Sequence, residues 1–181
     1  MSTATGSPSA PGVLAWKRVA FADLSPHQLY EFLQLRTDVF VMEQACAFQD
    51  MDGFDHLAVH LLGIANMPGH GEQLIAYARL FPPGIKFAEA SIGRVITRDT
   101  VRGTGLGHVL IREAICSVTA LWGAQPIRIG AQSRLTAYYR QHGFVEVGPT
   151  YLEDNIDHQD MLWQPPSNQT DSVNSHGATP P

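Results

Sequence analysis

Cysteines are rare in this sequence, and it has no long hydrophobic run. Two of its 181 residues are cysteines, Cys46 and Cys116, and they lack C-x-x-C spacing. A disulfide scaffold and a cysteine-rich zinc module are therefore excluded, and both thiols are expected to be packed rather than nucleophilic. No stretch approaches the roughly 18 uninterrupted apolar residues of a membrane span. Because residues 1–11 also lack the basic and apolar segments of a signal peptide, we expect a soluble, cytoplasmic protein without membrane contacts.

Charged residues are also scarce, at 16% of the chain against a usual share of about 25%. The 12 Lys and Arg residues are outnumbered by 17 Asp and Glu residues, which leaves a formal net charge of −5. This balance excludes broad binding to a nucleic-acid backbone, although backbone amides and one arginine can still hold a single phosphate group. The hydrophobic share of 44% and the length suit one domain with a sizeable core.

The two ends of the chain differ in composition from the rest. Residues 1–12 are mostly Ser, Thr, Ala, Gly and Pro, and Val173 is the only large aliphatic residue within 164–181. Neither stretch buries enough apolar surface to offset an ordering entropy of about 1–2 kcal/mol per residue. We therefore expect disordered tails at 1–12 and 164–181 around one domain at 13–163.

Strand-like and helix-like patterns alternate within 13–163. Ser25, Pro26 and Gln28 predict the capped start of a first helix, and residues 105–122 carry an apolar stripe at helical spacing. The predicted fold class is α+β, with a strand–helix–strand crossover in its middle. Strands are expected at 13–21, 56–63, 73–81, 90–97, 126–131, 144–147 and 158–163, and a short helix at 133–142.

A glycine-rich turn precedes the long helix. It reads RGTGLG from Arg102 to Gly107, directly after a predicted strand. Glycines let backbone N–H groups turn toward an anion, and a helix N-terminus adds unpaired donors and a positive dipole end. A Walker loop is excluded because no lysine is present, and the dinucleotide pattern fails because His108 occupies its last glycine position. The turn is predicted to hold a pyrophosphate group, and the alternative is a glycine-rich helix start that binds no ligand.

The spacing that fits this turn is [R/Q]-x-x-G-x-[G/A], filled by Arg102, Gly105 and Gly107. These residues resemble motif A of the GNAT superfamily of N-acetyltransferases. The segment QSRLTAYYRQHGF at 132–144 resembles a second superfamily motif, and RTDVFVMEQ at 36–44, IGRV, GAQ and YLEDNIDHQDM are similar to the ElaA-like branch. The resemblance covers most of 13–163. It implies a GNAT-like mixed central sheet flanked by helices, with the pyrophosphate loop of coenzyme A in the crossover.

The resemblance also implies the reaction and the residues that bind the cofactor. Acetyl-CoA is the expected co-substrate, without a metal, and the amine of a small molecule or peptide attacks it directly in a ternary complex. Gly93 marks either a bulge in the strand along which superfamily members bind the pantetheine arm or a tight packing position. The residues expected to bind the cofactor are Val95, Ile96, Thr97, Arg102, Gly103, Thr104, Gly105, Leu106, Gly107 and Gln132, the last standing where many relatives carry Asn.

Tyr139 matches the position of the superfamily's general acid, which protonates the leaving thiolate. A phenol of pKa about 10 and a thiolate of pKa about 8.5 make this transfer uphill by about 2 kcal/mol, which is tolerable if the hydrogen bond forms as the C–S bond breaks. Tyr138 is turned by about 100° along a helix and is not expected to face the cofactor. A base must deprotonate the acceptor amine, and a chain of water molecules can take the place of this base. The candidates are Glu43, His158, His60 and Asp154.

Other features leave alternatives open. The acidic loop QDMDGFD at 49–55 lacks the closing glutamate of a calcium loop, so it is interpreted as recognition of a cationic substrate or as a solvated turn. A non-catalytic acyl-CoA-binding module is the main alternative function. The spacing of Arg36 and Phe40 suggests a less favoured one, an enzyme like acyl-homoserine-lactone synthases. The pattern leaves open the acceptor amine and whether the chain forms a homodimer.

Overall fold

Helix α1 (Pro26–Arg36) begins where the sequence supplies a complete cap. The Ser25 hydroxyl accepts a hydrogen bond from the Gln28 backbone N–H at 3.2 Å, and the Gln28 side chain accepts one from the Ser25 N–H at 3.0 Å. The chain then widens into a π-helical segment, Thr37–Glu43. Such wider turns often occur at functional sites, and this one brings Glu43 to the pocket described below.

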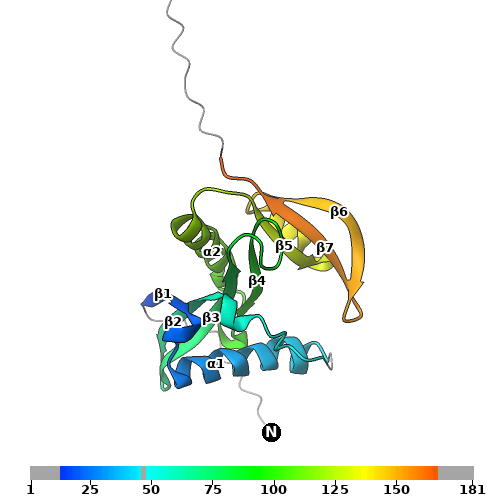
Figure 1. Cartoon of the computed structure of the whole chain (residues 1–181). Coiled ribbons are helices and arrows are strands. Elements are labelled where there is room, and N and C mark those ends of the chain that lie inside the picture. Colours follow the sequence, from blue (N-terminus) through cyan, green and yellow to red (C-terminus); the bar gives the residue numbers. More distant parts are fainter. Residues whose placement is uncertain (1–12, 46–47, 167–181) are drawn as a thin grey trace, which may run out of the picture.

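The computed structural model describes residues 13–45 and 48–166. They form a seven-stranded sheet in the order β1-β2-β3-β4-β5-β7-β6 (Figure 1). The predicted α+β class and element order are confirmed, and β6 is longer than expected. The remaining elements are β1 (Leu14–Ala20), β2 (Val59–Met67), β3 (Gly71–Phe81), β4 (Ala90–Thr97), α2 (Leu106–Trp122), β5 (Ile127–Gln132), α3 (Thr136–Arg140), β6 (Phe144–Glu153) and β7 (Ile156–Trp163).

Strands β4 and β5 diverge soon after they pair. They are parallel and joined by α2, as expected for the crossover, but within the described chain they are in register only at Ala90–Ile127 and Ser91–Arg128. Beyond these pairs β4 remains hydrogen-bonded to β3, while β5 continues along β7. The divergence leaves the carboxyl-terminal halves of the two strands apart, and a ligand can enter between them.

A bulge in β4 adds to this opening. Tyr77 of β3 faces Ile96, whereas Arg79 faces Gly93, so β4 carries one more residue than β3 between these pairs. Of the two alternatives left open at Gly93, the bulge is the one present, and a Cβ added at Gly93 would meet no atom within 4 Å. Its left-handed residue is Arg94 at φ 52°, and not the glycine. A bulge of this kind redirects a side chain, and here it turns Arg94 toward the pocket.

The two long helices cover opposite faces of the sheet (Figure 1). Since successive strand residues point to opposite faces, Leu61 and Ile75 pack in the cluster that contains α2, whereas Leu62 and Leu74 pack with Phe32 of α1. The predicted stripe of α2 is buried from Leu106 to Val118, but Leu121 at its end is 39% exposed. No helix of the described chain is long and apolar enough to cross a membrane.

Some expectations are wrong or fall outside the described residues. Cys116 is exposed because it lies on the outer side of α2, so its prediction as a packed thiol is wrong. Cys46 lies outside the described residues, as do the predicted tail at 1–12 and most of the tail at 164–181. Residues 164–166 are described and belong to no helix or strand.

Candidate functional site

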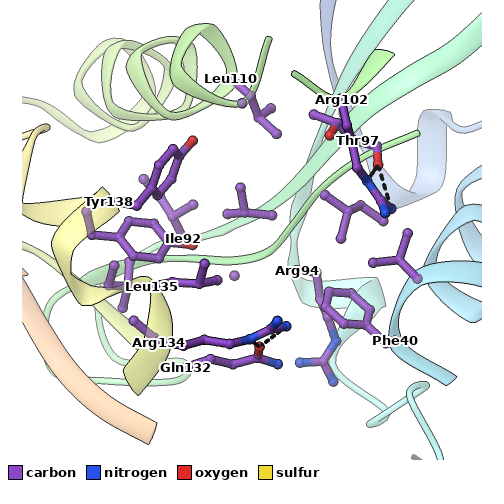
Figure 2. A pocket seen from close by; sticks show the side chains of 18 of the residues that line it. Phe40, Ile92, Arg94, Thr97, Arg102, Leu110, Gln132, Arg134, Leu135 and Tyr138 are labelled. Atoms are coloured by element: carbon purple, nitrogen blue, oxygen red, sulfur yellow. Dashed lines mark hydrogen bonds between the residues drawn. The ribbon is translucent and has the colours of Figure 1, made fainter. Parts of the chain in front are cut away.

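A pocket of about 1000 Å³ lies between the diverging strands β4 and β5 (Figure 2). Its walls come from the π-helical segment, β4, the glycine-rich turn, α2, β5, α3 and β7. All the predicted cofactor-binding residues except Thr104 line it, and so do Tyr139, Glu43 and His158. The Thr104 hydroxyl instead donates to the Val101 carbonyl at 2.7 Å and thereby stabilises the turn. Tertiary packing therefore brings the residues of the separate motifs to one cavity.

The glycine-rich turn has the geometry of an anion cradle. Gly103 and Gly105 adopt φ of 78° and 84°, a left-handed conformation that a side chain disfavours, and the space beside each α-carbon is open. Gly105 is the N-cap residue of α2, and no side chain caps this helix. The first N–H groups of α2 are therefore available to an external acceptor. This arrangement fits a pyrophosphate group such as that of coenzyme A.

Arg102 forms an ion pair with Glu43. Its Nη1 and Nη2 donate to the two carboxylate oxygens at 2.7 and 3.0 Å, which also raises the pKa of the arginine. The side chains are 42% and 39% exposed, so solvent screens the pair. The predicted phosphate ligand and a predicted base thus neutralise each other in this structure.

Both tyrosines of α3 line the pocket, so the expectation that Tyr138 faces away is wrong. A turn of 100° does not separate two long side chains beside one cavity, and the rings meet edge to face at 5.2 Å. The Tyr138 hydroxyl oxygen lies 3.0 Å from where a Cβ on Gly107 would be, which leaves no room there for a larger residue. Burial raises the pKa of Tyr138 to about 12 and that of the 8%-exposed Tyr139 further. Both phenols therefore stay protonated at neutral pH.

His158 offers a lone pair to the pocket. Its Nδ1 lies 2.8 Å from the Ile156 carbonyl oxygen, which can only accept a hydrogen bond. Nδ1 therefore carries the proton, and Nε2 of the neutral ring is an acceptor. The side chain lines the pocket from β7, beside the end of β5. His158 thus has the tautomer that a general base needs.

The amide of Gln132 is hydrogen-bonded to Arg134 and Gln44 at the end of β5. Its Oε1 accepts hydrogen bonds from Arg134 Nε and Nη2 at 3.0 and 2.8 Å, and its Nε2 donates to Gln44 Oε1 at 3.0 Å. A ligand that donates to Gln132 Oε1 would have to displace Arg134, whereas Gln132 Nε2 carries a second hydrogen that can still donate to a ligand. In the structure its amide holds Arg134 and joins β5 to the segment after the π-helix.

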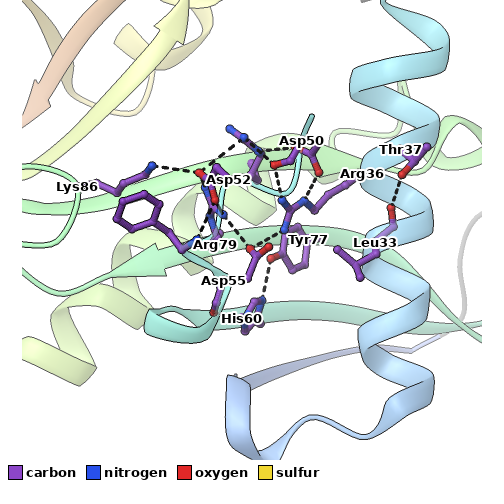
Figure 3. Close-up of polar contacts among 12 residues, drawn as sticks. Leu33, Arg36, Thr37, Asp50, Asp52, Asp55, His60, Tyr77, Arg79 and Lys86 are labelled. Atoms are coloured by element: carbon purple, nitrogen blue, oxygen red, sulfur yellow. Dashed lines mark hydrogen bonds and ion pairs between the residues drawn. The ribbon is translucent and has the colours of Figure 1, made fainter. Parts of the chain in front are cut away.

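The acidic loop at 49–55 is neither a solvated turn nor a cation-binding surface (Figure 3). Asp50, 4% exposed, accepts from Arg36 Nε at 2.6 Å and from Arg94 Nε at 2.7 Å. Asp52 and Asp55 both accept from the buried Arg79. Burial by itself would raise the pKa of each of these two carboxyls, but hydrogen bonds from Arg79 to Asp52 and from Arg36 to Asp55 hold both below the usual value. The carboxylates of the loop are therefore paired with arginines of the same protein.

His60 and Asp154 do not line the pocket, so neither serves there as the base. His60 is fully buried and stacked on Phe32 with 4.7 Å between ring centroids. Its Nε2 donates to the Asp55 carbonyl, and its Nδ1 accepts from the Tyr77 hydroxyl at 2.8 Å. The neutral ring has both nitrogens satisfied, which makes His60 a structural residue. Asp154 lies in the turn between β6 and β7.

His60 makes stability depend on pH. Burial lowers its pKa from 6.5 to about 4, so between these values the unfolded chain binds a proton that the folded chain does not. The free energy of unfolding is therefore expected to rise with pH across this window, with up to about 3 kcal/mol from this ring. Urea titrations from pH 4 to 7 measure the slope. His60→Gln should reduce it, whereas the control His27→Gln, at an exposed position of α1, should keep it; an unchanged slope in His60→Gln would contradict the prediction.

Some pocket residues were missed by the sequence reasoning. Phe40 lies under the Arg94 guanidinium, 5.6 Å from the ring centroid to Cζ, and both line the cavity with Gln44 and Arg134. Arg94 directly follows the glycine for which a bulge was expected, and that position could have identified it. Arg134 lies two residues after Gln132 within a recognised motif. No feature of the neighbouring sequence indicates that Gln44 lines the pocket.

Comparisons with known proteins agree with this geometry. Residues 69–165 match the family model for an acetyltransferase (GNAT) domain. A UPF0039 protein of Synechocystis sp. is 38% identical over 154 residues, 85% of this chain and 96% of its own. Protein ElaA of Escherichia coli is 37% identical over 151 residues, 82% and 95% of the two chains. A crystal structure described as an acyl-CoA N-acyltransferase from Pseudomonas aeruginosa superimposes with a TM-score of 0.74 at 41% identity, covering 83% of this chain and 99% of the other. The chain therefore belongs to the GNAT acetyltransferase family, with ElaA and UPF0039 proteins among its homologues.

Proposed function

We propose that the protein is an acyl-CoA-dependent N-acetyltransferase, which transfers the acetyl group of acetyl-CoA to a primary amine of a small molecule or peptide. The observation that carries this proposal is the uncapped, glycine-lined start of α2 at the mouth of the cavity between β4 and β5. The family membership and the acyl-CoA N-acyltransferase described among similar structures support it.

The cofactor would be held by two parts of the pocket. The backbone N–H groups from Gly103 to Gly107, with Arg102, would bind its pyrophosphate, while the backbone of Val95–Thr97 would bind the pantetheine arm. Acetyl-CoA supplies an acetyl group already activated as a thioester. Because Glu43 is paired with Arg102, the pyrophosphate would compete with this carboxylate for the guanidinium. Binding of the cofactor would therefore release Glu43.

Two side chains are proposed to move protons. His158 would take the proton of the attacking amine at Nε2, since its Nδ1 is occupied by the Ile156 carbonyl. Tyr139 would donate its phenolic proton to the departing thiolate. Burial raises the pKa of Tyr139, so this transfer must be coupled to C–S cleavage rather than precede it. Glu43, once released from Arg102, is the second candidate base.

Calorimetric titration with acetyl-CoA tests the binding step. The intact chain is expected to bind it, and Arg102→Ala to weaken binding about 10- to 100-fold, because a charge-assisted hydrogen bond contributes about 1.5–3 kcal/mol. Glu43→Gln is expected to strengthen binding, because it removes the competing carboxylate. Arg112→Ala, on the exposed side of α2, is the matched control and should bind like the intact chain. Absence of binding at millimolar concentration would contradict the proposal.

Thiol release across a panel of amines separates an enzyme from a non-catalytic acyl-CoA-binding module. An enzyme is expected to release free coenzyme A in proportion to acetylated amine with at least one acceptor. A protein that binds acetyl-CoA but transfers to no amine of a broad panel would favour the non-catalytic module.

A further inference from the structure

The charge of the pocket is unevenly distributed. Among the lining residues in the described part of the chain there are three arginines, Arg94, Arg102 and Arg134, and one carboxylate, Glu43. Glu43 is paired with Arg102 beside the glycine-rich turn. The other two arginines have no carboxylate partner from the pocket wall. Figure 2 shows both at the end of the pocket away from Arg102 and Thr97, with Arg134 and Gln132 extending from one wall and Arg94 from the other.

Arg94 belongs to an ion cluster that has one more cation than carboxylates. The cluster contains four cations, Arg36, Arg79, Lys86 and Arg94, and three carboxylates, those of Asp50, Asp52 and Asp55. Arg36 and Arg79 are 0% and 2% exposed, whereas Lys86 and Arg94 are 30% and 25% exposed. Of these four cations, Arg94 is the one that lines the pocket.

The hydrogen bonds of Arg94 orient it and leave part of it for a ligand. Nε donates to Asp50 Oδ1 at 2.7 Å and Nη2 to the Asp50 carbonyl at 3.1 Å. These two contacts fix the guanidinium plane and do not use Nη1. The residue also holds a left-handed φ of 52°, a conformation that costs a non-glycine residue about 1–3 kcal/mol and is typical of functional sites.

Arg134 is held by a neutral group. Its Nε and Nη2 both donate to Gln132 Oε1, and Gln132 is in turn held by Gln44. An amide orients a guanidinium but does not neutralise it. The end of the pocket therefore presents two oriented guanidinium groups, and guanidinium groups match a carboxylate in shape and charge.

We infer that this end of the pocket is an anion subsite, in which Arg94 and Arg134 bind a carboxylate of the acceptor, so that the acceptor is an amino-acid-like amine. Identifying the bound carboxylate as part of the acceptor rests on the proposed function, whereas the binding of a carboxylate by the two arginines does not. It also replaces the expectation of a cationic acceptor recognised by the acidic loop, because that loop's carboxylates are paired internally.

The cofactor's phosphates are the competing source of an anion. Arg94 precedes Thr97 by three residues, about 10 Å along a strand, and the glycine-rich turn begins only beyond Thr97. The two charged ends of the pocket thus suit two separate anions. An acceptor carboxylate at Arg94 and a pyrophosphate at Arg102 would place the reacting amine between them.

Thermal-shift titration of the full chain tests the subsite without catalysis. The probes are N-acetyl derivatives of the standard amino acids, each paired with its carboxamide, which has nearly the same shape but no charge. At least one acid is expected to raise the unfolding temperature more than its carboxamide, with an affinity about 10-fold or more higher. Arg134→Gln should abolish this difference and leave the dissociation constant of acetyl-CoA unchanged. Arg140→Gln, an exposed arginine of α3 paired with Glu146, is the matched control and should keep the difference.

The outcomes distinguish this inference from the proposed function. If acids and carboxamides bind equally, or if Arg134→Gln weakens acetyl-CoA instead of the acid, the subsite inference is wrong. If amines are acetylated but amino acids are no better acceptors than their carboxamides, the inference is wrong and the proposed function stands. If neither acetyl-CoA binding nor transfer occurs, the proposed function is wrong, and the thermal shift still decides whether the two arginines bind a carboxylate.

Discussion

Tyr139→Phe is expected to lower the turnover of acetyl transfer by about 10²- to 10⁴-fold, the usual contribution of a positioned acid or base. The phenol is buried beside the cavity and stays protonated because burial raises its pKa. Its ring packs edge to face on Phe144 at 5.9 Å, so a phenylalanine retains the packing and loses only the hydroxyl. The affinity for acetyl-CoA should change little. Steady-state thiol release and calorimetric titration measure the two quantities.

Tyr138→Phe is the matched control for this variant. Both tyrosines belong to α3 and line the same pocket, but the Tyr138 hydroxyl lies beside Gly107 at the start of α2. Its loss is expected to affect turnover far less than the loss of the Tyr139 hydroxyl. Equal losses in the two variants, or an unchanged turnover in Tyr139→Phe, would remove Tyr139 from the role of general acid.

Arg36→Met is expected to lower the free energy of unfolding by about 3 kcal/mol or more, in the range seen when one partner of a buried ion pair is removed. Arg36 is fully buried and donates to Asp50 at 2.6 Å and to Asp55 at 2.7 Å. Methionine fills much of the same volume but leaves these carboxylates short of a cation. At roughly 2–4 °C per kcal/mol for a chain of this size, the unfolding temperature should fall by about 6 °C or more.

Urea denaturation measures this loss of stability, and the removal of an exposed ion pair serves as the comparison. Arg140→Met removes an exposed ion pair with Glu146 and is expected to change the free energy of unfolding far less than Arg36→Met, because solvent screens exposed pairs. Adding Asp50→Asn to Arg36→Met should cost less than the separate effects of the two substitutions combined, because the carboxylate left unpaired is then removed. Similar small effects of Arg36→Met and Arg140→Met would show that the buried cluster contributes no more than a surface pair.

Much of the fold was predictable because its signals are local. The cap of α1 depends on Ser25 and Gln28, three residues apart, and the apolar stripe of α2 repeats within one helix. The glycine-rich turn was identifiable for the same reason, since left-handed residues and an uncapped helix start within one short segment define it. The motifs around Tyr139 and Gln132 likewise predicted residues that line the pocket.

The element order, the family and the position of the glycine-rich turn could thus be predicted, because each depends on neighbouring residues or on motif spacing. The pairing of the charges could not be predicted, because it depends on contacts between residues far apart in the chain. Glu43 meets Arg102 across 59 positions, and Asp50 meets Arg94 across 44. A charged side chain pairs with the opposite charge that the fold brings within hydrogen-bond distance, and burial strengthens this pairing by excluding water. For this reason the carboxylates of an acidic loop that was interpreted as recognising a cation are paired with arginines inside the protein, and one of these arginines, Arg94, lines the pocket.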